Sequence, residues 1–246
     1  MDRNNQNWNG FTGVKASVVA GIFARGGSQG IPRKALRKVG GLSLLERAVG
    51  DALSCSQIEA VFVSTDDEEF AAHAKSAGAE VPFLRPAHLA SHTAAEIDSW
   101  RHLIEFLDAN GEEVTTLVSV PPTAPLRLPK DIEAAINRFV ATGADIVVTG
   151  HESRRNPTFN MVTVDEGGRA HLAAHSDVPV VRRQDAPPLW DLTTVAYVAK
   201  SEYVLSAPSL FSGHVALSVV PAQRALDIDD EFDLYVADLL LRELGR

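Results

Sequence analysis

The residues best suited to chemistry form a loop of glycines and cations near the N-terminus. The loop follows a short apolar run at 18–24, whose composition is typical of a strand buried on both faces. Glycines let a backbone turn tightly and approach a ligand, free N–H groups in such a turn point at anions, and Arg and Lys add charge. The sequence therefore predicts a phosphate-binding loop made of Ala24, Arg25, Gly26, Gly27, Ser28, Gly30 and Lys34.

This loop matches neither of two widespread phosphate motifs. The sequence has no G-x-x-x-x-G-K-[ST], which excludes a Walker A loop, and no G-x-G-x-x-G, which argues against a dinucleotide site. The alternative interpretation is a glycine-rich surface loop whose charges are simply solvated.

A second chemical feature is an acidic segment near the C-terminus. Asp227 and Asp229 alternate with Leu226 and Ile228, so in an extended segment both carboxylates lie on one face. Two such carboxylates suit a Mg²⁺ ion that also holds a substrate phosphate. A helix-capping acidic cluster fits the segment equally well. The cationic loop favours the metal site, because phosphoryl transfer needs both cations and carboxylates.

Alternating strands and helices are predicted to position these two features. Sequence patterns of capping-box type begin helices at Ser43 and at Thr93. The alternation predicts an α/β fold with a doubly wound, mostly parallel sheet. The expected strands are 18–24, 59–64, 80–84, 115–120 and 145–149, and the expected helices are 44–53, 68–77, 93–110 and 129–142.

The sequence pattern changes between residues 151 and 189. Prolines and paired arginines replace the helical pattern, and 159–168 has the pattern of a hairpin. We interpret this stretch as an excursion from the sheet, either a flap or a dimerisation arm. Strands at 192–199 and 215–220 and a helix ending at Leu244 complete the chain.

Composition limits the class of protein. The chain has 246 residues, 45% of them hydrophobic, and a net charge of −9, which suits one α/β domain over 16–246 and argues against a nucleic-acid partner. A single cysteine, Cys55, excludes an internal disulfide.

Residues 1–15 are polar and are expected to be disordered rather than a signal peptide. With no apolar run long enough to span a membrane, we expect a cytoplasmic protein.

Four stretches resemble motifs of the CMP–sialic acid synthetases, or acylneuraminate cytidylyltransferases. The resemblance extends from about residue 18 to the C-terminus. The stretches are 24–34 (ARGGSQGIPRK), 85–91 (RPAHLAS), 122–127 (PTAPLR) and 227–229 (DID), the last followed by Glu231 and Asp233. The resemblance implies a Rossmann-like fold of the nucleotide-diphospho-sugar transferase type.

The resemblance also implies a reaction. An acceptor oxygen attacks the α-phosphate of CTP, pyrophosphate leaves, and a CMP conjugate of a small acidic acceptor forms. Arg25, Ser28 and Lys34 would hold the triphosphate, and Ser91 with the backbone near Ala87 would face the nucleotide. Asp227 and Asp229 would ligate Mg²⁺, with Asp227 close to the attacking oxygen, so Arg25, Lys34 and Asp227 are the expected catalytic residues.

The same resemblance implies a homodimer, in which 151–189 would form an arm that helps close the partner's acceptor pocket. The expected acceptor-binding residues are Pro121, Thr123, Arg127, Arg182, Arg183, Gln184, Thr193 and Thr194.

Several positions depart from the family pattern. Pro121 stands where the family usually has Gln, and Thr193–Thr194 where it often has Asn-Gly. Ala35 replaces the usual Asn on the nucleotide side, and His92 replaces a common acidic residue. Pro121 cannot donate the hydrogen bonds that Gln can. We therefore expect CTP to be the donor and the acceptor to differ from ordinary N-acetylneuraminate, with a phosphonate or another unusual acid as a variant.

Two other classes of function stay open at the level of sequence. A nucleotide-sugar glycosyltransferase, or a nucleotidyltransferase for another base, would share the fold, and Asp66–Asp67 after a strand weakly favours the former. A sensor that binds CTP without turnover is the third possibility.

Overall fold

The computed structural model describes residues 17–27, 30–91, 94–175 and 180–246. The expectations made for residues 1–15, for Ser28 and for His92 fall outside these ranges.

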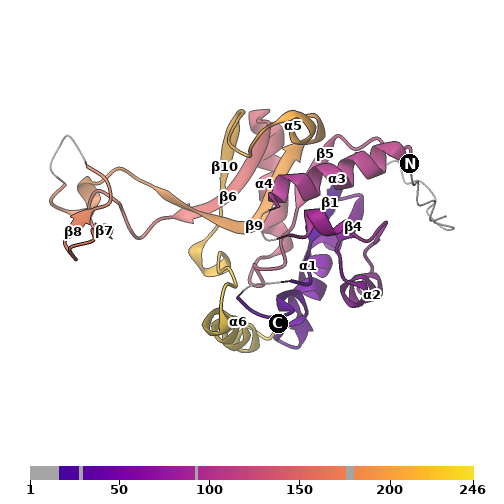
Figure 1. Ribbon diagram of the computed structural model, residues 1–246, viewed down its shortest axis with the longest axis horizontal. Coiled ribbons are helices and arrows are strands. Elements are labelled where there is room, and N and C mark those ends of the chain that lie inside the picture. The colour runs from indigo at the N-terminus through magenta and orange to yellow at the C-terminus, as the bar shows by residue number, and fades with distance from the viewer. Residues whose placement is uncertain (1–16, 28–29, 92–93, 176–179) are drawn as a thin grey trace.

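A six-stranded, mostly parallel sheet forms the centre of the molecule, as predicted (Figure 1). The strand order is β10-β6-β9-β5-β1-β4, and β9 runs antiparallel between β5 and β6. The strands are β1 (Val18–Phe23), β4 (Ala60–Ser64), β5 (Thr116–Ser119), β6 (Ile146–Glu152), β9 (Trp190–Lys200) and β10 (Val215–Val219). β1 lies between two parallel neighbours, so its carboxyl end opens onto the crevice where such sheets bind ligands.

Helices cover both faces of the sheet, which explains the apolar composition of its strands. α1 (Leu44–Leu53), α2 (Glu68–Ser76) and α4 (Pro129–Thr142) pack on one face, against side chains such as Ile22 and Val63. α3 (Glu96–Ala109) and α5 (Ser201–Ser206) pack on the other, where Trp100 is fully buried. Alternate residues of each strand point to opposite faces, so both faces of β1 are buried.

Local signals at the helix ends are partly confirmed. The capping box at Ser43 is present: the Glu46 N–H donates to Ser43 Oγ at 3.1 Å, and the Ser43 N–H donates to Glu46 Oε2 at 2.7 Å. The predicted capping box at Thr93 falls outside the described residues; α3 itself begins at Glu96, later than the predicted start of the helix. Helix α4 has the predicted bounds.

The predicted strand at 80–84 is also wrong. This segment makes only isolated bridges, from Glu80 to Phe62 and from Leu84 to Thr65. Pro82, which lacks an N–H donor, lies between the two bridges and prevents a continuous ladder.

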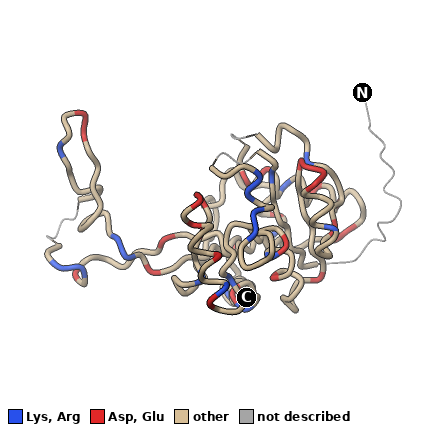
Figure 2. The backbone as a smooth tube through the Cα atoms, turned by 90° about the horizontal axis from the view of Figure 1, so that it is seen from below, with Lys and Arg blue, Asp and Glu red and all other residues tan. Residues whose placement is uncertain are grey.

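The segment after β6 leaves the body of the molecule as an arm. β6 and β9 continue beyond the sheet, and the excursion carries the predicted hairpin of β7 (Val162–Val164) and β8 (Ala170–Leu172), then the turn η3 (Arg183–Asp185). Figures 1 and 2 show the arm projecting away from the sheet, and the colours of Figure 2 mark both basic and acidic residues along its backbone. Its role in dimerisation stays a prediction.

The C-terminal helix α6 (Glu231–Glu243) packs on an early part of the chain. Leu234 and Leu241 share a small apolar cluster with Ile31, Val39 and Leu44. That early part contains η1 (Lys34–Leu36) and the short strands β2 (Lys38–Val39) and β3 (Leu42–Ser43). The two chemical features of the sequence thus lie on segments that pack together (Figure 1).

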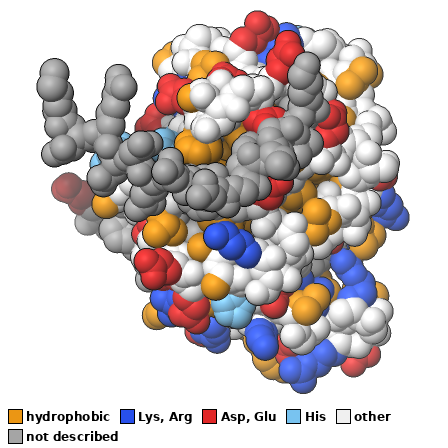
Figure 3. Space-filling model, turned by 90° about the vertical axis from the view of Figure 1, so that its right-hand side faces the viewer, with side chains coloured by type: hydrophobic (Ala, Val, Ile, Leu, Met, Phe, Trp, Pro, Cys, Tyr) orange, Lys and Arg blue, Asp and Glu red, His pale blue; other side chains and the backbone are white. Residues whose placement is uncertain are grey.

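The surface carries charges of both signs. On the face shown in Figure 3, acidic and basic side chains are interspersed with apolar ones. Within the described ranges, no helix combines the length and the apolar character that crossing a bilayer requires.

A buried ion pair joins α1 to the segment before α4. The Arg127 side chain is fully buried, and its Nε donates to Asp51 Oδ2 at 3.1 Å while Nη1 donates to Val195 O at 2.9 Å. Burial lowers the pKa of Arg127 and raises that of Asp51, so each charge depends on the other. Arg127 therefore supports the fold.

We expect Asp51→Asn to lower the free energy of unfolding by about 3 kcal/mol, because it leaves a buried charge without its partner. Urea unfolding monitored by circular dichroism measures this. Asp185→Asn is the control, because Asp185 pairs with Arg182 on the exposed arm and its loss should leave the midpoint unchanged. An Asp51→Asn protein with wild-type stability would contradict the assignment.

Candidate active site

A cavity of about 430 Å³, called here the main cavity, lies at the carboxyl end of β1. Residues of the glycine loop, of the proline-rich segment after β5 and of the acidic segment before α6 line it. Its lining residues are Phe23, Ala24, Arg25, Gly30, Lys34, Ala35, Leu44, Pro122, Thr123 and Asp229. The predicted phosphate loop and one of the two predicted metal ligands therefore share one cavity.

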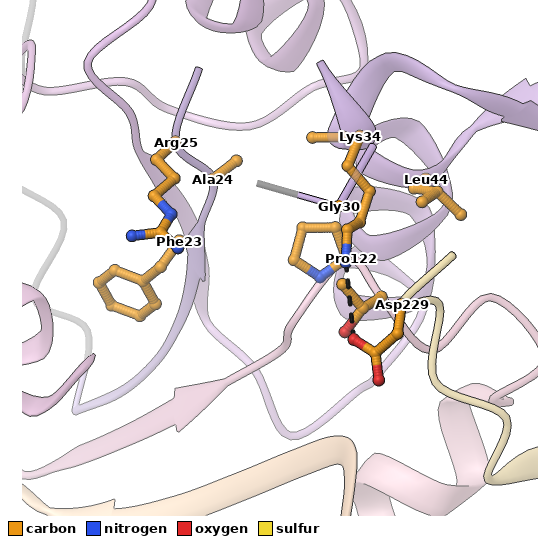
Figure 4. Close-up of a pocket in the computed structure, with 10 residues that line it drawn as sticks. Phe23, Ala24, Arg25, Gly30, Lys34, Leu44, Pro122 and Asp229 are labelled. Atoms are coloured by element: carbon orange, nitrogen blue, oxygen red, sulfur yellow. Dashed lines mark ion pairs between the residues drawn. The ribbon is translucent and has the colours of Figure 1, made fainter. Parts of the chain in front are cut away.

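Lys34 is the link between these distant segments. Its Nζ donates to Ile228 O at 2.6 Å and lies 3.7 Å from Asp229 Oδ1. Figure 4 shows Lys34 and Asp229 facing each other, with Arg25 on the opposite side of the cavity. A Cβ atom at Gly30 would lie 2.6 Å from Asp229 O, so only glycine allows this close approach.

Two carboxylates after β4 hold the other side of the loop. The Gly26 N–H donates to Asp66 Oδ1 at 2.9 Å. Arg33 donates to both oxygens of Asp67 at 2.9 and 3.1 Å, and also to Glu69 at 2.6 Å. The hydrogen bonds from Arg33 lower the pKa of Asp67, which also caps α2. This use of Asp66 and Asp67 weakens their interpretation as the acidic pair of a glycosyltransferase.

Hydroxyl groups connect the acidic segment to the sheet. Thr194 Oγ1 donates to Asp227 Oδ1 at 2.9 Å, and Thr123 Oγ1 donates to Thr194 Oγ1 at 3.1 Å. Ile228 is fully buried between the two aspartates, as the alternating pattern predicts. Predicted acceptor and metal residues therefore meet beside the main cavity.

No group of three or more His, Cys, Asp or Glu side chains that could hold a metal occurs in the described part of the chain. A divalent ion bound by Asp227 and Asp229 would have to take its remaining ligands from substrate and water, which is the usual arrangement for Mg²⁺.

A second cavity of about 280 Å³ adjoins the main one, and Phe23 and Arg25 line both. Its other lining residues are Arg85, Leu89, Ser91, Ala94, Glu96 and Ser99. Arg25 Nη1 donates to Ser91 O at 2.9 Å, which ties the glycine loop to the second predicted nucleotide loop. That loop includes the short turn η2 (Ala87–Leu89).

Arg85 and Glu96 were not among the predicted site residues. Arg85 is buried, its Nε donates to Ser64 Oγ at 3.0 Å, and burial lowers its pKa to about 10. The Glu96 side chain is open to solvent through the cavity, yet the surrounding protein raises the pKa of its carboxyl group. Only the position of Arg85 in the RPAHLAS stretch could have indicated either residue.

Tyr197 lies on β9, and its ring packs against Trp100 with centroids 5.6 Å apart. Burial, together with the charges of Glu96 and Asp227, raises the pKa of its phenol to about 12. The phenol therefore stays protonated and can donate a hydrogen bond near neutral pH.

The structure leaves several predicted acceptor residues outside the main cavity. Arg127 is buried in the ion pair with Asp51, and Thr193 is buried and donates to Thr149 Oγ1 at 3.0 Å. Pro121 adjoins the cavity in sequence, but Pro122 and Thr123 line it.

The arm residues lie elsewhere in the same chain. Arg182, which precedes η3, and Gln184, within it, are both exposed. Arg183 lines a separate cavity at the base of the arm with His151 and Arg154.

Comparison with known proteins identifies the family of the chain. A family model described as cytidylyltransferase matches residues 19–216. The chain is 31% identical to the post-translational flagellin modification protein B of Campylobacter coli, covering 93% of this chain and 96% of the relative. It is also 31% identical to the CMP-N,N'-diacetyllegionaminic acid synthase of Campylobacter jejuni, covering 92% and 95%.

Solved structures share the fold at lower identity. A CMP:2-keto-3-deoxy-manno-octonic acid synthetase complexed with CTP superposes with a TM-score of 0.71 at 16% identity, covering 93% of this chain and 99% of that one. A 4-diphosphocytidyl-2C-methyl-D-erythritol synthase gives 0.67 at 14% identity, with the same coverage. The extent of the family match and of the identity to full-length relatives leads to one conclusion: the chain belongs to the cytidylyltransferase family and is a nucleotidyltransferase.

Proposed function

We propose that the protein transfers CMP from CTP to an acidic sugar of the nonulosonic class and releases pyrophosphate. The observation that carries the proposal is the meeting of Arg25 and Lys34 with Asp229 in one cavity at the carboxyl end of β1. Relatives with 25–31% identity are named for legionaminic, pseudaminic and N-acylneuraminic acids, which supports this acceptor class.

The chemistry follows from the charges around the main cavity. As the acceptor oxygen bonds to the α-phosphorus and the bond to pyrophosphate breaks, negative charge grows on the phosphoryl and leaving oxygens. Arg25 and Lys34 stabilise that charge, and their hydrogen bonds to Ser91 O and Ile228 O orient them before the substrate arrives. Lys34 would exchange its loose pairing with Asp229 for a phosphate oxygen.

The acidic segment fits Mg²⁺. Thr194 holds one oxygen of Asp227 and orients its carboxylate, while the Asp229 side chain is 83% exposed. One or two carboxylates completed by phosphate oxygens are the typical protein ligands of this ion. Bound there, Mg²⁺ would neutralise charge on the triphosphate.

The acceptor side is where the protein should differ from ordinary sialic acid synthetases. Thr194 is engaged with Asp227 and Thr123, and Pro121 offers no side-chain donor. A buried polar group of the sugar left without a partner costs about 1–3 kcal/mol. We therefore propose an acceptor other than N-acetylneuraminate.

We further propose that the arm acts in a homodimer, where it completes the acceptor pocket of the partner. The support is that Arg183 lies away from the main cavity of its own chain, on an arm that projects from the body (Figures 1 and 2). The two arginines of the arm, Arg182 and Arg183, could bind the carboxylate of a sugar acid or a phosphonate equally well.

Pyrophosphate release tests the function directly. With CTP and Mg²⁺, we expect release with one acceptor from a panel of nonulosonic acids, octulosonic acids and phosphonates, little with N-acetylneuraminate, and none with the other nucleoside triphosphates. Efficient conversion of N-acetylneuraminate would contradict the acceptor proposal. CTP binding without turnover on any acceptor would favour a sensor.

A mixing experiment tests the shared site. Arg25→Ala and Arg183→Ala proteins should each be inactive, but co-expressed with different tags they form hybrid dimers with one intact site. Random pairing should restore about a quarter of wild-type activity per chain. Arg25→Ala mixed with Lys34→Ala is the control, because both changes lie in the same half-site and no intact site can form. Failure of the first mixture to recover activity would contradict a site shared between subunits.

A further inference from the structure

Arg33 has a backbone conformation that the reaction described above does not explain. Its φ of 52° and ψ of 37° lie in the left-handed region, and among the described residues it is the only one besides glycines with a positive φ. Residues with a Cβ atom avoid this region, because the Cβ comes too close to the following carbonyl oxygen. Arg33 lines neither the main cavity nor the second one. A contact outside both cavities must therefore stabilise this conformation.

The side chain of Arg33 makes that contact with the start of α2. It donates to both carboxylate oxygens of Asp67, at 2.9 and 3.1 Å, and to Glu69 at 2.6 Å. Its guanidinium carbon also lies 4.9 Å from the centroid of the Phe70 ring. Asp67 is fixed in turn, because its Oδ1 accepts from the N–H groups of Glu69 and Phe70. We call the two-bond pairing of Arg33 with Asp67 the clasp.

The left-handed turn directs two consecutive residues to different parts of the fold. Arg33 reaches back to α2, whereas Lys34 begins η1 and donates to Ile228 O at 2.6 Å. The Leu36 N–H donates to Arg33 O at 2.9 Å, so η1 is built directly on this turn. Figure 4 shows the result, with Lys34 pointing toward Asp229. A different conformation at Arg33 would change the direction in which Lys34 leaves the backbone.

The carboxylates that follow β4 also hold the start of the glycine loop. The Gly26 N–H donates to Asp66 Oδ1 at 2.9 Å, and a Cβ atom at Gly26 would lie 3.0 Å from Asp67 Oδ2. Gly26 and Arg33, near the two ends of the loop, therefore meet the same pair of aspartates. A loop attached at both ends has fewer conformations open to it, so its cations reorganise less when a ligand binds.

The clasp is poorly placed to stabilise the whole fold. The Arg33 side chain is 44% exposed, and that of Asp67 is 20% exposed. Ion pairs this close to solvent contribute little to the free energy of unfolding. The conformation of a single residue responds to a much smaller energy than global unfolding does. The effect of the clasp should therefore be local, on the direction of Lys34.

We propose that Arg33 is a positioning residue for Lys34: its pairing with Asp67 holds residue 33 in the left-handed conformation that presents the Lys34 ammonium group to the triphosphate. Arg33 acts through Lys34 and does not itself touch the nucleotide. The inference rests on the proposed use of CTP. A glycine would adopt the same backbone conformation, but only a side chain tied to Asp67 also fixes it.

Two substitutions separate the clasp from the backbone conformation. Arg33→Ala and Arg33→Gly remove the same charge, but only glycine enters the left-handed region readily. Calorimetry with CTP and Mg²⁺ should show at least about tenfold weaker binding for Arg33→Ala, the value of one hydrogen bond to a charged group, and a smaller loss for Arg33→Gly. With the acceptor found in the panel, kcat should fall in the same order, while the KM of the acceptor stays unchanged.

A double substitution tests whether Arg33 acts through Lys34. Adding Arg33→Ala to Lys34→Met should weaken CTP binding no further, because the positioned group is already absent. Asp67→Asn keeps a good helix cap but loses the charged pairing, so it should resemble Arg33→Ala. Arg242→Ala is the matched control: it breaks an exposed pair with Asp238 at 2.7 Å, outside both cavities, and should bind CTP like the wild type. Circular dichroism verifies that the variants fold.

Wild-type affinity for CTP in Arg33→Ala would overturn the proposal. So would equal losses in Arg33→Ala and Arg33→Gly, which would assign the effect to the lost charge. A full further loss in the Lys34→Met background would also overturn it, because Arg33 would then act independently of Lys34.

Failure of the wild type to bind CTP would contradict the proposed function instead. Amide hydrogen exchange followed by NMR still tests the clasp in that case. The Leu36 amide, which donates to Arg33 O, should exchange several-fold faster in Arg33→Ala than in the wild type. An unchanged exchange rate would overturn the proposal.

Discussion

The contact between the glycine loop and the acidic segment is the constraint on which the site depends. Lys34 donates to the Ile228 carbonyl at 2.6 Å, and the absence of a side chain at Gly30 lets the loop meet the backbone of Asp229. Arg37 adds a bidentate pair with Glu231 at 2.6 and 2.8 Å. Helix α6 packs against the residues that follow the loop, so segments from opposite ends of the sequence are fixed at the carboxyl end of β1.

The same loop is held from three directions. Asp66 and Asp67 restrain it from the end of β4, the Ser91 carbonyl accepts from Arg25, and Ile228 and Asp229 contact it from the acidic segment. Catalysis by positioning requires cations that do not have to reorganise when charge develops. Backbone carbonyls, Ser91 O for Arg25 and Ile228 O for Lys34, keep these cations oriented, and the 3.7 Å pairing of Lys34 with Asp229 is loose enough to be exchanged for a phosphate oxygen.

Much of the fold could be predicted because its signals are local. A strand buried on both faces is apolar throughout, as β1 is, and a proline at the first turn marks the start of α4. The failure at 80–84 has a local cause too, because Pro82 interrupts a segment that otherwise has the composition of a strand.

The site was only partly predictable, because its composition depends on tertiary contacts. The glycine loop and Asp229 were identified from residue types and family resemblance, and they do share a cavity. Arg127 looked like a binding residue, because the sequence cannot show that its side chain is buried against Asp51. Arg85 and Glu96 were missed for the opposite reason: only the packing of α3 on the sheet brings them to one cavity.

The most direct test of the central claim is the affinity of the main cavity for CTP. Calorimetry should show that Lys34→Met weakens CTP binding at least about tenfold, because a charged donor to the triphosphate is lost. Lys38→Met, which removes an exposed lysine in β2 outside the cavity, should bind CTP like the wild type. Equal affinity of the Lys34→Met and wild-type proteins would contradict the placement of the triphosphate at this loop.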